Sequence, residues 1–174
     1  MGSVLGNSSL IKKVYVPKFI FPISRVVSSF VNLLFSLAAI ILVMLITRSP
    51  FHLTILLVWA PLVLLFLFTC GIALLLSALA VYFRDLQYLY SIVTMAWMYA
   101  TPLFYPISAL PPFMVAIVKL NPLYHYINCM RCLVMYGTVP GPNTWFACIV
   151  CAVGVMVVGL AAFRKLQRNF ILYL

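Results

Sequence analysis

The 174-residue chain has almost no acidic side chains, since Asp85 is its only carboxylate against eleven Lys and Arg residues. General acid–base pairs, two-metal centres and carboxylate metal cages each need at least two Asp or Glu side chains placed together. The sequence also lacks a Gly-rich phosphate loop, a His-Glu-x-x-His motif and a nucleophile elbow. We therefore expect a chain that is not itself an enzyme and that binds no nucleotide, metal or other cofactor.

Charge of either sign is scarce, because charged residues make up 7% of the chain and hydrophobic residues 67%, with a mean hydropathy of +1.22. Soluble domains have about 25% charged and about 45–50% apolar residues. These values predict an all-α integral membrane protein. The basic residues stand in small clusters at the ends of apolar runs, which favours membrane anchoring and argues against nucleic-acid binding.

Four apolar segments are long enough to cross a membrane, because about 20 helical residues at about 1.5 Å each cover a core of about 30 Å. The predicted spans are residues 23–48, 53–83, 86–104 and 145–163, and the third has the weakest hydrophobic signal. No internal repeat or Gly/Ser linker divides the sequence. We therefore predict a single membrane domain over residues 1–174.

The positions of the basic residues predict the orientation of the chain. With residues 1–22 and the tail 164–174 in the cytosol, eight basic residues fall on the inner side and three on the outer side. The inner ones are Lys12, Lys13, Lys18, Arg25, Arg84, Arg164, Lys165 and Arg168, and the outer ones are Arg48, Lys119 and Arg131. Both ends are thus expected to be cytosolic.

Residues 105–142 contain many prolines, which cut them into two short apolar pieces, 113–120 and 123–136. Neither piece is long enough to cross a membrane. Short helices between prolines fit a helical hairpin on the outer side. From the residues alone, this hairpin is either re-entrant or lies at the membrane interface.

Two cysteine pairs, Cys129-x-x-Cys132 and Cys148-x-x-Cys151, have the spacing of a four-cysteine zinc site. Cys148 and Cys151 fall inside the fourth predicted span, where thiolates and a hydrated metal ion are unfavourable. We therefore expect no metal site and assign the cysteines to helix packing, while an external disulfide through Cys129 or Cys132 remains an alternative.

Four motifs together, in this order around the predicted spans, are typical of one protein family. They are Asn7-Ser8-Ser9-Leu10-Ile11-Lys12-Lys13-Val14-Tyr15-Val16-Pro17, Tyr82-Phe83-Arg84-Asp85-Leu86, Thr101-Pro102-Leu103-Phe104-Tyr105-Pro106, and Leu120-Asn121-Pro122-Leu123 followed by Arg131. The chain resembles the membrane subunit of type-2 ATP-binding-cassette (ABC) exporters of lipid-linked polysaccharides, teichoic acids or O-antigens. Because family members usually begin with a cytosolic amphipathic helix and two further spans, the sequence resembles the C-terminal part of such a permease. It also lacks the acid that relatives commonly carry in the last helix.

The resemblance implies a permease of the bacterial plasma membrane that dimerises around a channel and is driven by separate ATPase subunits, which bind the ATP and Mg²⁺. It implies a coupling helix in residues 1–22 that docks on the ATPase and a cytoplasmic turn at Arg84 and Asp85. The coupling residues are Asn7, Leu10, Ile11, Lys12, Lys13, Val14 and Pro17. An interfacial helix anchored by its basic residues is the alternative for this segment.

Aromatic residues of the third span and the outer segment are candidates to face the channel or the glycan. These candidates are Trp97, Tyr99, Tyr105 and, as a basic residue, Arg131. The alternative is anchoring at the membrane interface, where Trp and Tyr are enriched.

Two other functions compete with export. One is a membrane enzyme of lipid-linked sugar metabolism, although such an enzyme normally needs several acidic residues to bind a metal or act as a general base, and this chain has one. The other is a small ion-coupled carrier that uses Asp85 for protons, since intramembrane acids are often functional. Asp85 lies at the end of a span beside Arg84, which favours a cytoplasmic turn over a proton relay.

Overall fold

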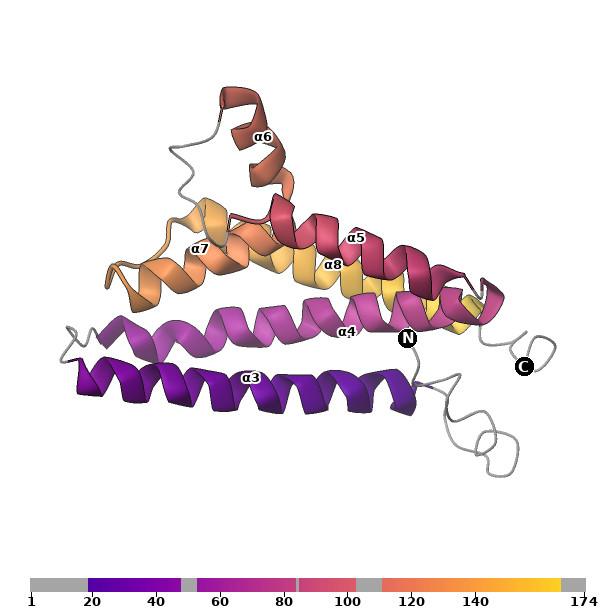
Figure 1. Ribbon diagram of the computed structural model, residues 1–174, viewed down its shortest axis with the longest axis horizontal. Helices are drawn as coiled ribbons and strands as arrows, with labels where there is room; N and C mark the ends of the chain where they lie inside the picture. Colours follow the sequence, from indigo (N-terminus) through magenta and orange to yellow (C-terminus); the bar gives the residue numbers. More distant parts are fainter. Residues whose placement is uncertain (1–18, 48–52, 84, 103–110, 167–174) are drawn as a thin grey trace. The chain divides into compact units, whose positions relative to one another are not determined.

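The computed structural model describes residues 19–47, 53–83, 85–102 and 111–166, and these residues form helices joined by turns and short loops, with no strand among them. The helices, drawn in Figure 1, are α3 (Ile20–Ile46), the 3₁₀-helix η1 (Leu53–Val58), α4 (Trp59–Tyr82), α5 (Leu86–Ala100), α6 (Pro112–Leu120), α7 (Pro122–Val134) and α8 (Pro142–Leu166). The predicted all-α class is therefore confirmed. The predicted coupling helix and the tail beyond Leu166 lie outside the described residues.

Three helices are long and apolar enough to cross a membrane: Ile20–Ile46, Thr54–Tyr82 and Pro142–Leu166. They agree with the predicted spans 23–48, 53–83 and 145–163. The span predicted at 86–104 corresponds to α5, whose 15 residues rise about 22 Å against a core of about 30 Å. The helix ends at Ala100 because the residue before Pro102, Thr101, is disfavoured in helical conformation. A fourth span thus stays a prediction.

The chain divides into two compact units, and each is described by itself. The first unit consists of Met1–Phe51, Phe66–Leu86 and Ala152–Leu174. Its described part holds α3, most of α4 and the second half of α8. Its core contains Leu74, Ala78 and Val81 of α4 and Phe163 of α8. Partly buried side chains that pack on this core include Phe21, Ile23 and Leu160.

Two glycines of the first unit bring the backbones of α4 and α8 into direct contact. A Cβ atom on Gly71 of α4 would lie 2.6 Å from the carbonyl oxygen of Val155 and 2.7 Å from the Cα of Met156. A Cβ atom on Gly159 of α8 would overlap the carbonyl oxygen of Gly71. Contacts between small residues allow membrane helices to approach closely and pack by dispersion forces. The crossing of α4 and α8 therefore depends on having no side chain at either position.

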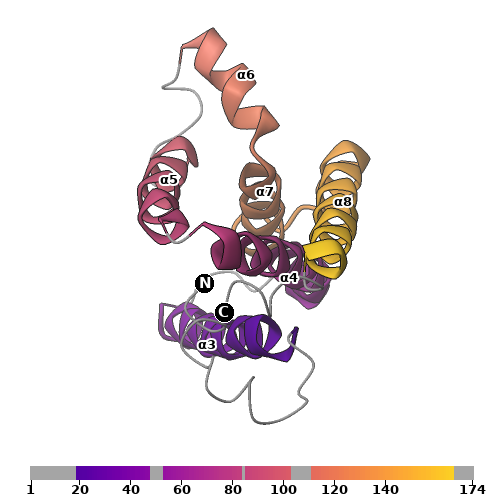
Figure 2. The same cartoon turned by 90° about the vertical axis from the view of Figure 1, so that its right-hand side faces the viewer.

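The second unit consists of His52–Leu65 and Gln87–Cys151. In it, α7 packs against η1, where the Thr54 hydroxyl donates to the carbonyl of Leu133 at 2.9 Å. The Tyr126 hydroxyl of α7 donates to the carbonyl of Cys148 in α8 at 2.8 Å. Figure 2 shows α6 continuing into α7 within this unit. Helices α6 and α7 agree with the two predicted apolar pieces, and their depth in the membrane, re-entrant or interfacial, stays a prediction.

The five cysteines are free thiols. Within the described ranges, no three His, Cys, Asp or Glu side chains are grouped so that they could hold a metal ion. Cys129 and Cys148 are fully buried, and burial raises the pKa of the Cys129 thiol, which keeps it protonated. These thiols pack as small apolar side chains.

Candidate functional site

Asn121 bonds to three residues of the second unit through one side-chain amide. Its Oδ1 accepts hydrogen bonds from the backbone N–H of Leu123 at 3.1 Å and from the indole Nε1 of Trp97 at 2.9 Å. Its Nδ2 donates to the hydroxyl of Thr101 at 2.9 Å. Asn121 is also the N-cap of α7, a position where an Asn side chain satisfies an exposed N–H of the first turn. One amide thus fixes the start of α7 against the end of α5.

Thr101 closes the network at the end of α5. It is 2% exposed, and its hydroxyl donates to the carbonyl of Trp97, one turn earlier, at 2.8 Å. The described residues contain no buried side-chain nitrogen or oxygen without a hydrogen-bond partner. A fully satisfied buried network rigidifies its surroundings, because breaking one bond leaves a costly unpaired group.

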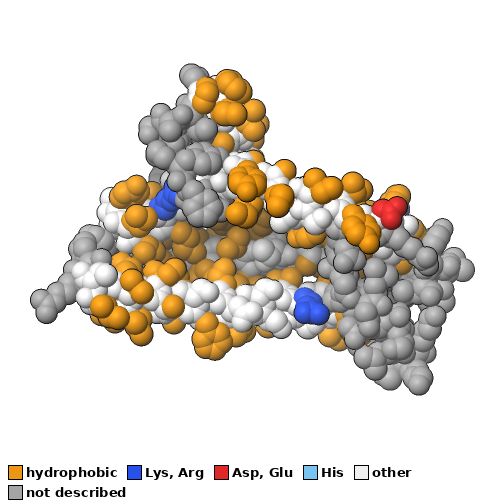
Figure 3. Space-filling model, viewed as in Figure 1, with side chains coloured by type: hydrophobic (Ala, Val, Ile, Leu, Met, Phe, Trp, Pro, Cys, Tyr) orange, Lys and Arg blue, Asp and Glu red, His pale blue; other side chains and the backbone are white. Residues whose placement is uncertain are grey.

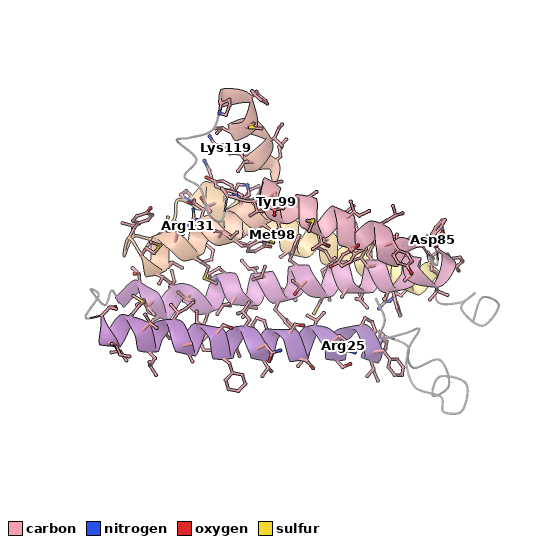
Figure 4. The ribbon with its side chains drawn as sticks, in the orientation of Figure 1. Arg25, Asp85, Met98, Tyr99, Lys119 and Arg131 are labelled. Carbon is pink, nitrogen blue, oxygen red and sulfur yellow. The ribbon has the colours of Figure 1, made fainter. Side chains whose placement is uncertain are left out.

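Arg131 adds the fourth member, from α7 (Figure 4). Its Nη2 donates to the carbonyl of Pro102 at 3.0 Å. Carbonyls at and beyond a helix end have no partner within the helix, and here a guanidinium supplies one to the segment that follows α5. We call Trp97, Thr101, Asn121 and Arg131 the junction network.

The junction network brings together two of the four residues predicted to face the channel or the glycan. Trp97 and Arg131 are both half-buried, and each donates to a group of this chain. Tyr99 lies on α5 with 69% of its side chain exposed, and Tyr105 lies outside the described residues. Their roles toward a channel or glycan stay predictions, and Trp97 and Arg131 additionally position α7 against α5.

Thr101 and Asn121 belong to two of the family motifs in the sequence, but neither was predicted to be a site residue. The available signal was local: an Asn directly before Pro122 is a favourable helix start, since Asn caps and proline suits the first helical turn. That Trp97 and Thr101 would supply the partners of Asn121 required the three-dimensional fold.

Asp85 lies exposed in the turn between α4 and α5, as expected for a residue at a span end. It is labelled in Figure 4 and is the red side chain in the space-filling view of Figure 3. Arg84 and the coupling residues from Asn7 to Pro17 lie outside the described residues. The exposed position of Asp85 agrees with a surface turn.

Exposed apolar side chains are frequent on α5. They include Tyr88, Tyr90, Ile92, Met95, Met98 and Tyr99. Figure 3 shows hydrophobic side chains in patches along this helix. A surface of this composition is unsuited to water and suits lipid or a second membrane helix.

Comparisons with known proteins agree with these features. Residues 6–135 match the ABC-2 type transporter family. Two O-antigen export system permease proteins RfbA of Klebsiella pneumoniae are each 31% identical to this chain over 173 residues, which is 97% of the chain. The chain spans 65% of the length of these relatives. With three helices long and apolar enough to cross a membrane and this match, the chain is a bacterial multi-pass membrane protein that belongs to the ABC-2 type transporter family.

Proposed function

We propose that this chain is the membrane-embedded permease subunit of an ATP-driven exporter of lipid-linked polysaccharide, with O-antigen or teichoic acid as the substrate class. The observation that carries the proposal is the 31% identity to O-antigen export permeases along 97% of the chain. The junction network supports it, because it joins the Thr101-Pro102 motif to Asn121 and Arg131, three features typical of such permeases.

In this proposal the chain does no chemistry. A chain with a single carboxylate cannot assemble an acid–base pair or a two-metal centre from its own residues. ATP and Mg²⁺ bind to separate ABC ATPase subunits, and two copies of the permease enclose the path of the glycan. The exposed aromatic and thioether side chains of α5 are candidates for the wall of that path.

Both ends of the chain face the cytosol in this proposal. Within the first unit, the Tyr82 hydroxyl donates to the carbonyl of Leu166 at 3.0 Å, so the C-terminal ends of α4 and α8 lie together. Exposed Arg164 and Lys165 mark that end of α8, which suits the cytosolic side under the positive-inside rule. The Arg84–Asp85 turn, directly after α4, then lies on the side from which an ATPase acts.

The direct test is complementation in a bacterium that lacks its own O-antigen permease. The full-length protein, expressed with its cognate ABC ATPase, should restore glycan at the cell surface. A catalytically dead ATPase should abolish this export and leave lipid-linked glycan inside. Export that persists with the dead ATPase would contradict the proposal.

We expect that replacing Leu10, Lys12 and Lys13 together by alanine lowers export at least roughly tenfold, because the conformational change of the ATPase would no longer be transmitted to the permease. A control with Lys119→Ala and Leu120→Ala, two exposed residues of α6, should keep export near the wild-type level. The measurement is surface glycan per permease in the membrane. Full export by the triple variant would argue for a purely interfacial role of residues 1–22.

Asp85→Asn separates the exporter from an ion-coupled carrier. We expect ATP-dependent export to remain within about twofold of wild type, because an exposed Asp in a turn relays no proton across the membrane. A carrier that relied on Asp85 would lose coupling outright. Surface glycan and proton uptake, measured on the same vesicles, distinguish the two.

A further inference from the structure

Helix α7 is hydrogen-bonded to three other helical segments of the second unit. The junction network joins it to the end of α5. The Tyr126 hydroxyl of α7 donates to the carbonyl of Cys148 in α8 at 2.8 Å. The Thr54 hydroxyl of η1 donates to the carbonyl of Leu133 in α7 at 2.9 Å. A single helix of 13 residues therefore holds η1, the end of α5 and the first part of α8.

The bond from Thr54 caps the C-terminal end of α7. The last four carbonyls of a helix have no partner within the helix. In α7 the carbonyls of Arg131 and Cys132 accept backbone N–H groups of residues 135–138, in the turn where Gly137 has a φ of 62°. The carbonyl of Leu133 accepts the Thr54 hydroxyl instead. Part of the cap of α7 thus comes from η1, a segment that lies far from it in the sequence.

The bonded side of α7 is closed to solvent. Tyr126, Cys129 and Leu133 recur at helical spacing along it and are 2%, 0% and 0% exposed. If α7 moved away from η1 or α8, the hydroxyls and carbonyls that it now pairs would lose their partners. Unpaired polar groups are costly in a dry interior, and bonds that depend on the same helix break together. Separation of any one segment from α7 is therefore strongly opposed.

We propose that α7, η1, the end of α5 and the first part of α8 move as one rigid body during transport, with Thr54 and Tyr126 as the residues that position η1 and α8 on it. The path of the glycan then opens beside this body and not between its helices. A displacement of α5 is carried to the spans Thr54–Tyr82 and Pro142–Leu166, because their first residues are bonded to the same helix. The proposal rests on the proposed function for its transport measurements only.

A covalent bond between η1 and α7 has opposite effects if the two move together and if they separate. The Thr54 side chain reaches the backbone of Leu133, which suits a disulfide between these positions. The full-length protein, with its native cysteines replaced by alanine, carries Thr54→Cys and Leu133→Cys and is assayed with its cognate ABC ATPase. Oxidation to the disulfide should keep or raise export relative to the reduced form, because it replaces the lost hydrogen bond. Export that falls on oxidation and recovers on reduction would overturn the proposal.

Conservative substitutions separate positioning from folding. Thr54→Val and Tyr126→Phe keep the shape of the side chain and remove the hydroxyl, whereas Thr54→Ser keeps a hydroxyl. We expect the ATP hydrolysed per glycan exported to rise roughly two- to tenfold in the first two variants, the range for one lost hydrogen bond. Thr54→Ser should match the wild type. A purely structural role would lower the amount of folded permease without changing this ratio, so a wild-type ratio in both hydroxyl-free variants would contradict the positioning role.

Spin labels test the rigid body without a transport assay. Leu56 of η1 and Met135, directly after α7, are both exposed and can be replaced by labelled cysteines. In the complex with the ATPase, electron–electron double resonance should give one distance that is the same with and without ATP. A second distance, or a shift with ATP, would refute the rigid body even if export is intact. If the wild-type protein exports no glycan but keeps the single distance, only the proposed function is wrong.

Discussion

Placing a methyl group on Gly71 or on Gly159 should separate α4 from α8 and destabilise the first unit. The added Cβ of Gly71→Ala would lie 2.6 Å from a carbonyl oxygen and 2.7 Å from a Cα and a nitrogen of the facing helix, all of them backbone atoms that no rotamer change can remove. Overpacking of this kind costs about 1–3 kcal/mol. Valine at either position should cost more and should lower the yield of folded protein.

The direction of the change in stability distinguishes a steric conflict from the ordinary effect of helix propensity. Alanine is about 1 kcal/mol more favourable than glycine within a helix, so a substitution without steric conflict should stabilise slightly. Gly154→Ala provides this control on α8, because its Cβ would have no atom within 4 Å. We expect Gly71→Ala and Gly159→Ala to lower, and Gly154→Ala to keep or raise, the unfolding midpoint in mixed detergent micelles. Equal midpoints for all three variants would contradict the close crossing.

The second large effect is expected from Asn121→Leu. This change removes the acceptor of Trp97 Nε1, the partner of the Thr101 hydroxyl and the cap of the Leu123 N–H. Each hydrogen bond contributes about 1 kcal/mol, and an unpaired buried group costs about 1–3 kcal/mol. We therefore expect a loss of about 2–4 kcal/mol. Because α7 would no longer be fixed to α5, we also expect export to fall.

Graded variants separate the bonds of Asn121. Asn121→Asp keeps both accepted bonds and loses the donor to Thr101, so its stability should fall between wild type and Asn121→Leu. Asn143→Leu repeats the same substitution at an exposed residue in the first turn of α8 and should be close to neutral. Hydrogen exchange of the Leu123 amide reports the cap directly. Wild-type protection of that amide in Asn121→Leu would refute the assignment of the cap.

The parts of the fold that follow from local composition were predictable from the sequence. Hydropathy alone located three helices that are long and apolar enough to cross a membrane, because about 20 apolar residues without charge have few alternatives to a membrane helix. The prolines likewise delimited α6 and α7. The length of α5 was harder to predict, since its last residues precede Pro102 and the hydropathy signal does not report where the helix ends.

The contacts that close the candidate site were not predictable, because they join residues distant in sequence. Trp97 and Asn121 are 24 residues apart, and Arg131 donates to the carbonyl of Pro102, which lies 29 residues earlier. No periodicity links such pairs. Gly71 and Gly159 are likewise ordinary glycines in sequence, and only the crossing of their helices distinguishes them from Gly154.

The bond from Tyr82 to Leu166 also has a consequence for how the protein is made. Helices α3 and α4 are neighbours in sequence and can associate as soon as both have entered the membrane. The face of α4 that carries Gly71 and Leu74 can be buried only after α8 has been synthesised, and Leu166 of α8 lies 84 residues after Tyr82. At a synthesis rate of about 5–20 residues per second, this delay is roughly 4–17 s. During that interval the most closely packed surface of α4 is covered only by lipid. A ribosome stalled before Pro142 should therefore leave a cysteine placed at Leu74, which packs with Phe163 in the finished protein, open to an alkylating reagent that partitions into the membrane.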